Sequence, residues 1–204
     1  MTKAVLFAAL FLIFLINAES QPTYSIKSAK IEFNFSGASL KGTRTLIFMD
    51  SGYLTRQEMF TYPDTSAISA FMDTHKPNRI PDTTATSFIR ENRQYTLLIY
   101  KRDSLFMIDM DASVGHITKM NPLEQDPIIP TGCKKIGVDT FLGRQCDIFD
   151  NGIFKLWYWK GLVLKDEGTN PDGSKILDYA TTIDEDYVPA KDAFDIPPGV
   201  VIKH

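Results

Sequence analysis

The stretch from residue 132 to residue 200 constrains the fold of this chain more than any other. It reads GCKKIGVDTFLGRQCDIFDNGIFKLWYWKGLVLKD, continues with ILDYATTIDEDYVP and ends in FDIPPGV, and it contains both cysteines and both tryptophans. Apolar and aromatic residues are grouped in short segments, and glycine, asparagine and proline separate these segments. Strands that follow one another through short turns pair antiparallel, because a parallel pair needs a long crossover connection.

The N-terminal part predicts a meander of the same kind. In residues 29–36, Ile31, Phe33 and Phe35 alternate with polar residues, as in a strand with one buried face. The further strand-like segments, separated by turn signals, are RTLIFMD, YLTRQEMFTY, TSFIREN, RQYTLLIYK and SLFMIDM. We therefore predict a mainly β fold of about ten strands, either a single curved antiparallel sheet or an open barrel.

Three segments depart from this pattern. Residues 64–76 predict a short covering helix that ends before Pro77, and residues 112–132 predict a loop or a broken helix. The final segment, AFDIPPGVVI, contains two prolines in a row, which confine it to an edge of the sheet or to the terminus.

The first 18 residues have the layout of a secretory signal peptide. One lysine precedes an apolar run from Ala4 to Ile16, and Ala18 offers a cleavage point. The run of about 13 residues is shorter than the roughly 20 that a membrane-spanning helix needs. No later segment is long and apolar enough to be one. We expect one domain at 19–204, periplasmic if the source is a double-membraned bacterium and secreted otherwise.

Charge and cysteine content limit the partners. The 22 basic and 25 acidic side chains are scattered, so the basic face that a nucleic acid requires is not expected. Two cysteines in an exported chain predict one disulfide, between Cys133 and Cys146, across a hairpin that turns around residues 138–142. The three histidines are far apart in the sequence, and no metal or other cofactor is expected.

No catalytic motif is recognisable in the sequence. A Gly-x-Ser-x-Gly elbow, a phosphate-binding glycine pattern and a cysteine with its base are all missing from it. A hydrolase assembled in space from Asp109, Asp111 and His116 is the weakest of the hypotheses, since carboxylates at strand ends are usually solvated. We expect a protein that is not an enzyme.

Several segments are apolar on both sides, so both faces of the middle of the sheet should be covered. Trp157 and Trp159 are two residues apart and share one side of their strand. The interior that such residues line is either a filled core or a ligand cavity, and the filled core is the commoner outcome. The candidates for lining an apolar cavity are Phe33, Phe35, Phe48, Leu97, Ile99, Phe106, Ile108, Trp157 and Trp159.

The order of short motifs in the C-terminal part resembles that of a known superfamily. The motifs are Gly137, Leu142-Gly143-x-x-Cys146, then Leu156-x-Tyr158-Trp159-x-Gly161-x-Val163-x-Lys165, and finally Phe194-x-Ile196-Pro197-Pro198-Gly199. They are similar to those of the periplasmic outer-membrane lipoprotein carrier and sorting-protein superfamily, the LolA-like proteins. The resemblance implies a single curved antiparallel sheet that forms an open half-barrel of about ten or eleven strands, with a helical lid and an apolar concave side that takes up acyl chains. An arginine helps to hold the lid shut in the carriers, and neither Arg44 nor Arg56 is assigned that role.

Two functions follow as hypotheses. The first is binding of a lipid or an acylated protein, with lipoprotein transport or sorting in the cell envelope as one form of it. The second is a structural or protein-interaction module of the envelope, with a filled core and an exposed sheet edge.

Overall fold

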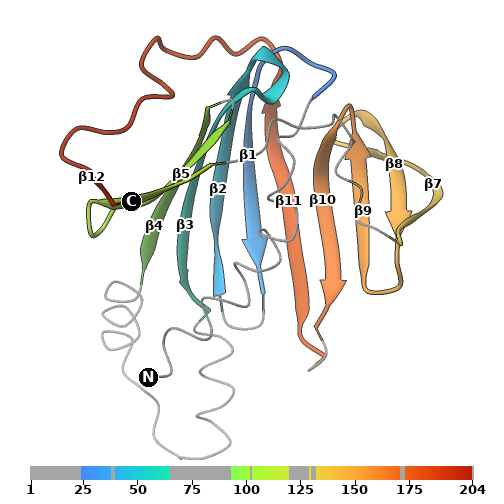
Figure 1. Ribbon diagram of the computed structural model, residues 1–204. Helices are drawn as coiled ribbons and strands as arrows, with labels where there is room; N and C mark the ends of the chain where they lie inside the picture. The colour runs from blue at the N-terminus through green and yellow to red at the C-terminus, as the bar shows by residue number, and fades with distance from the viewer. Residues whose placement is uncertain are drawn as a thin grey trace, which may run out of the picture.

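The computed structural model describes residues 24–37, 40–64, 93–101, 103–119, 129, 132–170 and 173–203 of the 204-residue chain. These residues form one open sheet of twelve strands (Figure 1). The strands are β1 (Ala29–Ser36), β2 (Leu40–Met49), β3 (Leu54–Pro63), β4 (Gln94–Lys101), β5 (Ser104–Asp109), β6 (Val114–Lys119), β7 (Lys134–Phe141), β8 (Arg144–Asp150), β9 (Phe154–Trp159), β10 (Leu162–Thr169), β11 (Lys175–Asp184) and β12 (Val201–Lys203). The helical content of the described residues is one 3-10 turn, η1 (Asp50–Gly52).

The sheet consists of two meanders joined in the middle. Its strand order is β12-β6-β5-β4-β3-β2-β1-β11-β10-β9-β8-β7, so β1 to β6 form one meander and β7 to β11 the other. Every neighbouring pair is antiparallel except β12 and β6, which are parallel. The prediction of a mainly β, open, curved antiparallel sheet is confirmed, with twelve strands in place of ten or eleven.

Some sequence predictions need correction, and others lie outside the described residues. Residues 114–119 form strand β6, where a loop or a broken helix was predicted, because both β5 and β12 supply pairing edges to a segment that contains Val114, Ile117 and Thr118. The predicted signal peptide, residues 65–76 of the predicted helix and the strand-like segment TSFIREN at 86–92 lie outside the described part of the chain. Among the residues that are described, no helix has the length and apolar composition needed to cross a membrane.

The predicted disulfide is wrong, because the hairpin turns later than expected. Cys133 and Cys146 are both free thiols. The turn between β7 and β8 lies at Leu142 and Gly143, whose φ angles of 47° and 73° suit a tight two-residue hairpin. This register places Cys146 opposite Asp139, while Cys133 precedes the Lys134 that pairs with Asp150. The two cysteines are thus at least four residues apart along the strand, about 13 Å, and a disulfide requires a Cα separation below about 7 Å.

Apolar side chains cover both faces of the sheet, as the two-sided apolar segments predicted. Phe48 on β2 belongs to a buried cluster that also contains Ile31 and Phe33 of β1, whereas Ile47 belongs to a second cluster with Leu97, Ile99 and Ile108. Consecutive residues of a strand point to opposite faces. The two clusters therefore lie on opposite sides of β2.

The segment after β11 covers the second cluster. Phe194 is buried against Ile47, Leu97, Ile99 and Ile108, and further residues of this segment pack around it: Tyr187, Ala193, Ile196 and Val200. Arg56 of β3 donates a hydrogen bond from Nη1 to the carbonyl oxygen of Ala193, at 3.1 Å. The segment ends in β12 at the edge of the sheet, the place that its prolines predicted (Figure 1).

The opposite face, which bears Phe48, is the concave one. The backbone N–H of Tyr24 donates to the carbonyl of Ser51, and that of Ser25 donates to the carbonyl of Lys160. Ser51 lies between β2 and β3 and Lys160 between β9 and β10, so in a flat sheet the two would be separated by three or more strand spacings, about 14 Å. Two consecutive residues reach both sites because the sheet curves toward them, and the Tyr24 ring lies 4.3 Å from that of Phe48.

Candidate functional site

The nine residues predicted to line an apolar cavity lie on two faces of the sheet. Phe33, Phe48, Trp157 and Trp159 are part of the first cluster, and Leu97, Ile99, Phe106 and Ile108 belong to or pack against the second. Phe35 is half-buried on the same side of β1 as Phe33. Because the clusters are on opposite faces of β2, one cavity cannot include all nine, and their role in ligand binding stays a prediction.

Charged side chains close off the two tryptophans. Each indole ring has two cations within 3.9 to 5.1 Å of its centroid: Lys155 and Lys165 for Trp157, Arg144 and Lys160 for Trp159. Asp139 accepts a hydrogen bond from Nε1 of Trp157 at 3.1 Å. The apolar stems of lysine and arginine can cover aromatic rings while their charged ends stay in water. A lipid chain that reached Trp157 or Trp159 from this side would have to displace them.

Tyr158 alternates with the tryptophans along β9. It faces the concave side, whereas the two indole rings, although they belong to the first cluster, point to the other side of β9. Burial raises the pKa of the Tyr24 hydroxyl well above its usual range, and both Tyr100 and Tyr158 add to this effect. Tyr100 is on β4 and Tyr158 on β9, six strand spacings apart, which is about 29 Å in a flat sheet. Both act on Tyr24 because the sheet curves toward it, as the hydrogen bonds of Tyr24 and Ser25 to the two meanders show.

An ion pair crosses the floor of the concave face. Arg44 of β2 lies directly opposite Phe33 of β1, and its guanidinium group stacks 3.7 Å from the Phe33 ring centroid. The side chain passes over β1 to β11, where Nη2 donates to Oδ2 of Asp178 at 2.7 Å. The side chains of Arg44 and Asp178 are only 10% and 17% exposed. A charge-assisted hydrogen bond of this length is among the stronger polar contacts in proteins.

A second carboxylate faces this ion pair. Asp166 of β10 lies directly opposite Asp178 of β11 in the register of the two strands. Burial, followed by the negative charge of Asp178, raises the pKa of the Asp166 carboxyl to about 6, and Arg44 partly offsets this increase. Two carboxylates opposite one guanidinium give the cluster one surplus negative charge when Asp166 is ionised. We call Arg44, Asp166 and Asp178 the buried charge cluster.

The hydrogen bonding of this cluster is incomplete. Three of its buried atoms, Nε of Arg44 and Oδ1 of both Asp166 and Asp178, have no hydrogen-bond partner in the part of the chain that the structure describes. Folded proteins leave few buried polar atoms in this condition, since each costs about 1–3 kcal/mol. A donor and two acceptors are therefore without a partner in this part of the structure, beside apolar side chains such as Phe33 and Leu46.

The sequence alone did not reveal the buried charge cluster. No role follows for Arg44 from the sequence, and neither Asp166 nor Asp178 belongs to a recognisable motif. The sequence signal that points to Asp178 is its position two residues before the apolar Ala180, because residues two apart lie on one face of β11. Asp166 carries no comparable signal, since only its pairing with Asp178 brings it to the cluster.

Other carboxylates near strand ends, including Asp109 and Asp111 of the hydrolase hypothesis, accept hydrogen bonds from backbone N–H groups. Asp109 accepts a hydrogen bond from the backbone N–H of Ala112, and Asp111 accepts one from the backbone N–H of Tyr95. Asp184 accepts from the N–H of Asp186, two residues later. His116 is exposed on β6, opposite Met107 of β5. These contacts explain the carboxylates as turn-stabilising groups.

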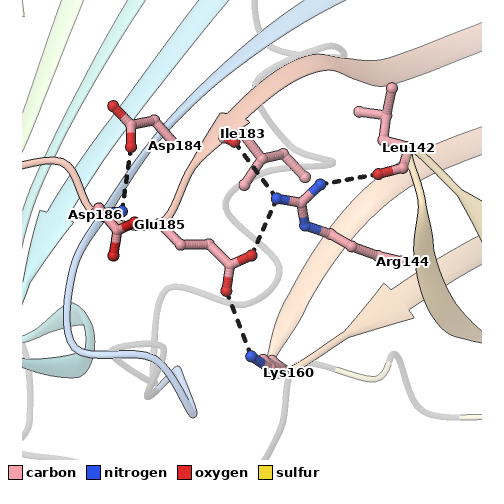
Figure 2. A network of polar contacts seen from close by, with 7 residues as sticks. All are labelled: Leu142, Arg144, Lys160, Ile183, Asp184, Glu185 and Asp186. Carbon is pink, nitrogen blue, oxygen red and sulfur yellow. Dashed lines mark hydrogen bonds and ion pairs between the residues drawn. The ribbon is translucent and has the colours of Figure 1, made fainter.

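A polar network fixes the end of β11 beside the tryptophans. Figure 2 shows Arg144 donating to the carbonyls of Leu142 and Ile183, at 2.9 and 3.4 Å, and to the carboxylate of Glu185 at 3.0 Å. Lys160 contacts the other oxygen of Glu185 at 3.4 Å. The network ties the β7–β8 and β9–β10 turns to the start of the covering segment, and we assign it a structural role.

Comparison with known proteins finds a similar fold but does not show to which family the chain belongs. No protein-family model and no curated protein matches the chain. An uncharacterized conserved protein from Thermus thermophilus is similar in structure, with a TM-score of 0.53, 7% identity and coverage of 96% of this chain and 98% of that one. MucB aligns with a TM-score of 0.43 and 15% identity over 94% of this chain and 63% of its own. At 7% identity the likeness to the Thermus protein concerns the fold alone, and membership of the lipoprotein-carrier superfamily stays a prediction.

Proposed function

We propose that this chain is an exported, non-enzymatic protein that binds a lipid or another hydrophobic ligand on the concave face of its open sheet. Transport or sorting of lipoproteins in a cell envelope is the form of this function that the sequence resemblance suggests. The proposal places the ligand on the face of Phe33, Phe48 and Tyr100, and not on the face of Ile99 and Ile108, which the C-terminal segment covers.

The observation that carries the proposal is the incomplete hydrogen bonding of the buried charge cluster. A filled core gains nothing from a buried guanidinium and two carboxylates with three open hydrogen-bonding atoms, because apolar residues of similar volume are often at least as stable. A ligand whose chain covers the apolar floor and whose polar end reaches this cluster would satisfy the open atoms. Burial of each methylene group of such a chain would contribute about 0.8 kcal/mol.

Native mass spectrometry of protein exported by its host and purified without detergent tests this proposal. We expect masses that exceed the chain mass by those of lipids. Met59 lies opposite Arg44 on the concave face, so Met59→Trp should reduce the bound fraction. Phe60 is next in the strand and points to the other face, which makes Phe60→Trp the matched control. Ligand-free spectra for the unaltered protein, obtained repeatedly, would contradict the proposal.

A second candidate function rests on strand β7. All residues from Lys134 to Thr140 are exposed, including Ile136 at 57% and Val138 at 51%. In the described sheet β7 is an end strand, and such an edge can pair with a strand of another protein. If the chain is an interaction module, cross-linking through β7 should recover a defined partner, and Val138→Lys should abolish the cross-link while Val188→Lys should not.

Export is testable independently of the ligand. Removal of residues 1–18 predicts that the mature chain begins at Glu19, which N-terminal sequencing of the exported protein would establish. A chain that retains Met1 and stays with the membrane fraction would contradict the predicted cleavage.

A further inference from the structure

We propose that the buried charge cluster is a head-group site for a primary ammonium group, so that the ligand is an amphiphilic amine with its alkyl chain on the concave face. This inference rests on the proposed function and makes it more specific. It assigns the two carboxylates to the nitrogen of the ligand and Arg44 to the positioning of Asp178.

The charge of the cluster selects a cation. Arg44 neutralises one carboxylate through the 2.7 Å contact with Asp178, and Asp166 remains without a cation of its own within the cluster. The first effect of a bound carboxylate or phosphate would be to place a third anion beside Asp166 and Asp178. Electrostatic interactions are strengthened where water is displaced, so both the repulsion of an anion and the attraction of an ammonium group should be large here.

The hydrogen-bonding atoms of the cluster that lack a partner also favour an ammonium group. Oδ1 of Asp166 and Oδ1 of Asp178 are acceptors, and an ammonium group offers three N–H donors. The two carboxylates lie directly opposite each other on neighbouring strands, a spacing at which one small group can contact both. Nε of Arg44 is the one donor of the cluster that has no partner in the described residues. A hydroxyl oxygen next to the ligand nitrogen, as in an amino alcohol, would accept a hydrogen bond from it.

The burial of Arg44 distinguishes this cluster from acidic residues that merely lie near one another. Its side chain is nine-tenths buried, is fixed between the Phe33 ring and Asp178, and still has an unpaired Nε. The exposed carboxylates of Asp109 and Asp184, in contrast, are occupied by backbone N–H groups of their own turns. Three of the four buried atoms without a partner in the described residues thus belong to this cluster, and the fourth, Nε of Arg144, lies in the polar network of Figure 2.

The direct test compares amphiphiles of one chain length and different head groups. Dodecylamine and dodecanoate, each below its critical micelle concentration, and dodecanol below its solubility limit would be titrated into the full chain at pH 7.5 by isothermal calorimetry. We expect dodecylamine to bind at least tenfold more tightly than dodecanoate, with dodecanol between them. A preference for dodecanoate would overturn the head-group assignment and leave the proposed function standing, and the absence of binding by all three would overturn both.

Two variants test whether the preference for dodecylamine arises at the buried charge cluster. Asp166→Asn removes the surplus charge and should reduce the affinity for dodecylamine about tenfold while leaving dodecanol unchanged. Glu167→Gln is the control, because Glu167 is the next residue of β10, points to the other face, pairs with Lys165 at 2.8 Å and acts least on the pKa of Asp166 among the groups that shift it. A preference for the amine that survives Asp166→Asn would contradict the assignment.

A pH series adds an independent readout. Three charged groups shift the pKa of Asp166: Asp178 of β11, Arg44 of β2 and Glu167, the next residue of β10. Burial and, to a smaller extent, the charge of Asp166 in turn raise the pKa of the Cys133 thiol. Since the pKa of Asp166 is raised to about 6, the amine preference should weaken as the pH falls from 7.5 to 5. Asp166→Asn should lack this change, and an equal pH dependence in both proteins would count against the site.

Discussion

At the scale of single residues, Asp166 links folding stability to pH. Its pKa is raised from 3.8 to about 6 by burial and by Asp178, so between these values the folded chain holds a proton that the unfolded chain has released. The stabilisation is complete below pH 3.8 and is lost as the pH rises through 6, by up to about 3 kcal/mol. Asp166→Asn should therefore raise the free energy of unfolding at pH 7.5 by on the order of 2 kcal/mol and have little effect at pH 4.

Urea unfolding of both proteins at the two pH values measures this difference. Glu167→Gln serves again as the control, since it changes the same formal charge on the same strand outside the cluster. If Asp166→Asn and the unaltered chain lose the same stability between pH 4 and pH 7.5, another group is responsible for the dependence.

The Arg44–Asp178 pair makes a second prediction at this scale. Arg44→Met leaves Asp178 buried without its cation and should cost about 3–5 kcal/mol, because an uncompensated buried charge is strongly destabilising. Replacing both partners, with Arg44→Met and Asp178→Leu together, should recover most of the loss. Chemical denaturation measures the free energy of unfolding of both variants. If Arg44→Met is as stable as the unaltered chain, the Arg44–Asp178 pair is solvated.

At the scale of elements, the covering segment depends on one aromatic side chain. Phe194 is 6% exposed and contacts apolar residues of β2, β4 and β5, so Phe194→Ala should cost about 3–5 kcal/mol. The segment should then detach, and trypsin should cleave it at Lys191 faster. Val188→Ala, at an 85% exposed position of the same segment, should change neither property. Equal cleavage rates for the two variants would mean that the segment is held by its polar contacts instead.

Local patterns in the sequence predicted most of the elements and misplaced some boundaries. The alternation of Ile31, Phe33 and Phe35 gave strand β1 correctly, because one buried face has a period of two residues. The β7–β8 hairpin was centred between the cysteines, whereas Leu142 and Gly143 form the turn with positive φ angles. A leucine with φ of 47° is disfavoured locally, so only the pairing of the whole hairpin fixes the turn there.

At the scale of the whole molecule, the sequence could not assign the faces of the sheet. Phe48 and Ile47 are equally apolar neighbours, yet they belong to clusters on opposite sides. The buried charge cluster is likewise a product of the complete fold, since Arg44 is separated from Asp178 by 134 residues. Long-range strand order decides both features, and a single sequence carries little information about it.

The curvature of the sheet gives the last prediction. Tyr24 is buried on Phe48 of one meander, and its neighbour Ser25 is hydrogen-bonded to the turn of the other, so this short segment couples the two. Tyr24→Ala should cost about 3–5 kcal/mol and weaken the cooperativity of unfolding. Both tryptophans lie on β9, so fluorescence reports the β7–β11 meander, whereas far-UV circular dichroism reports the whole sheet. The two transitions should coincide in the unaltered chain and in Tyr53→Ala, whose ring is 41% exposed, and separate in Tyr24→Ala. Coincident transitions in Tyr24→Ala would show that the β1–β11 pairing alone suffices to hold the two meanders together.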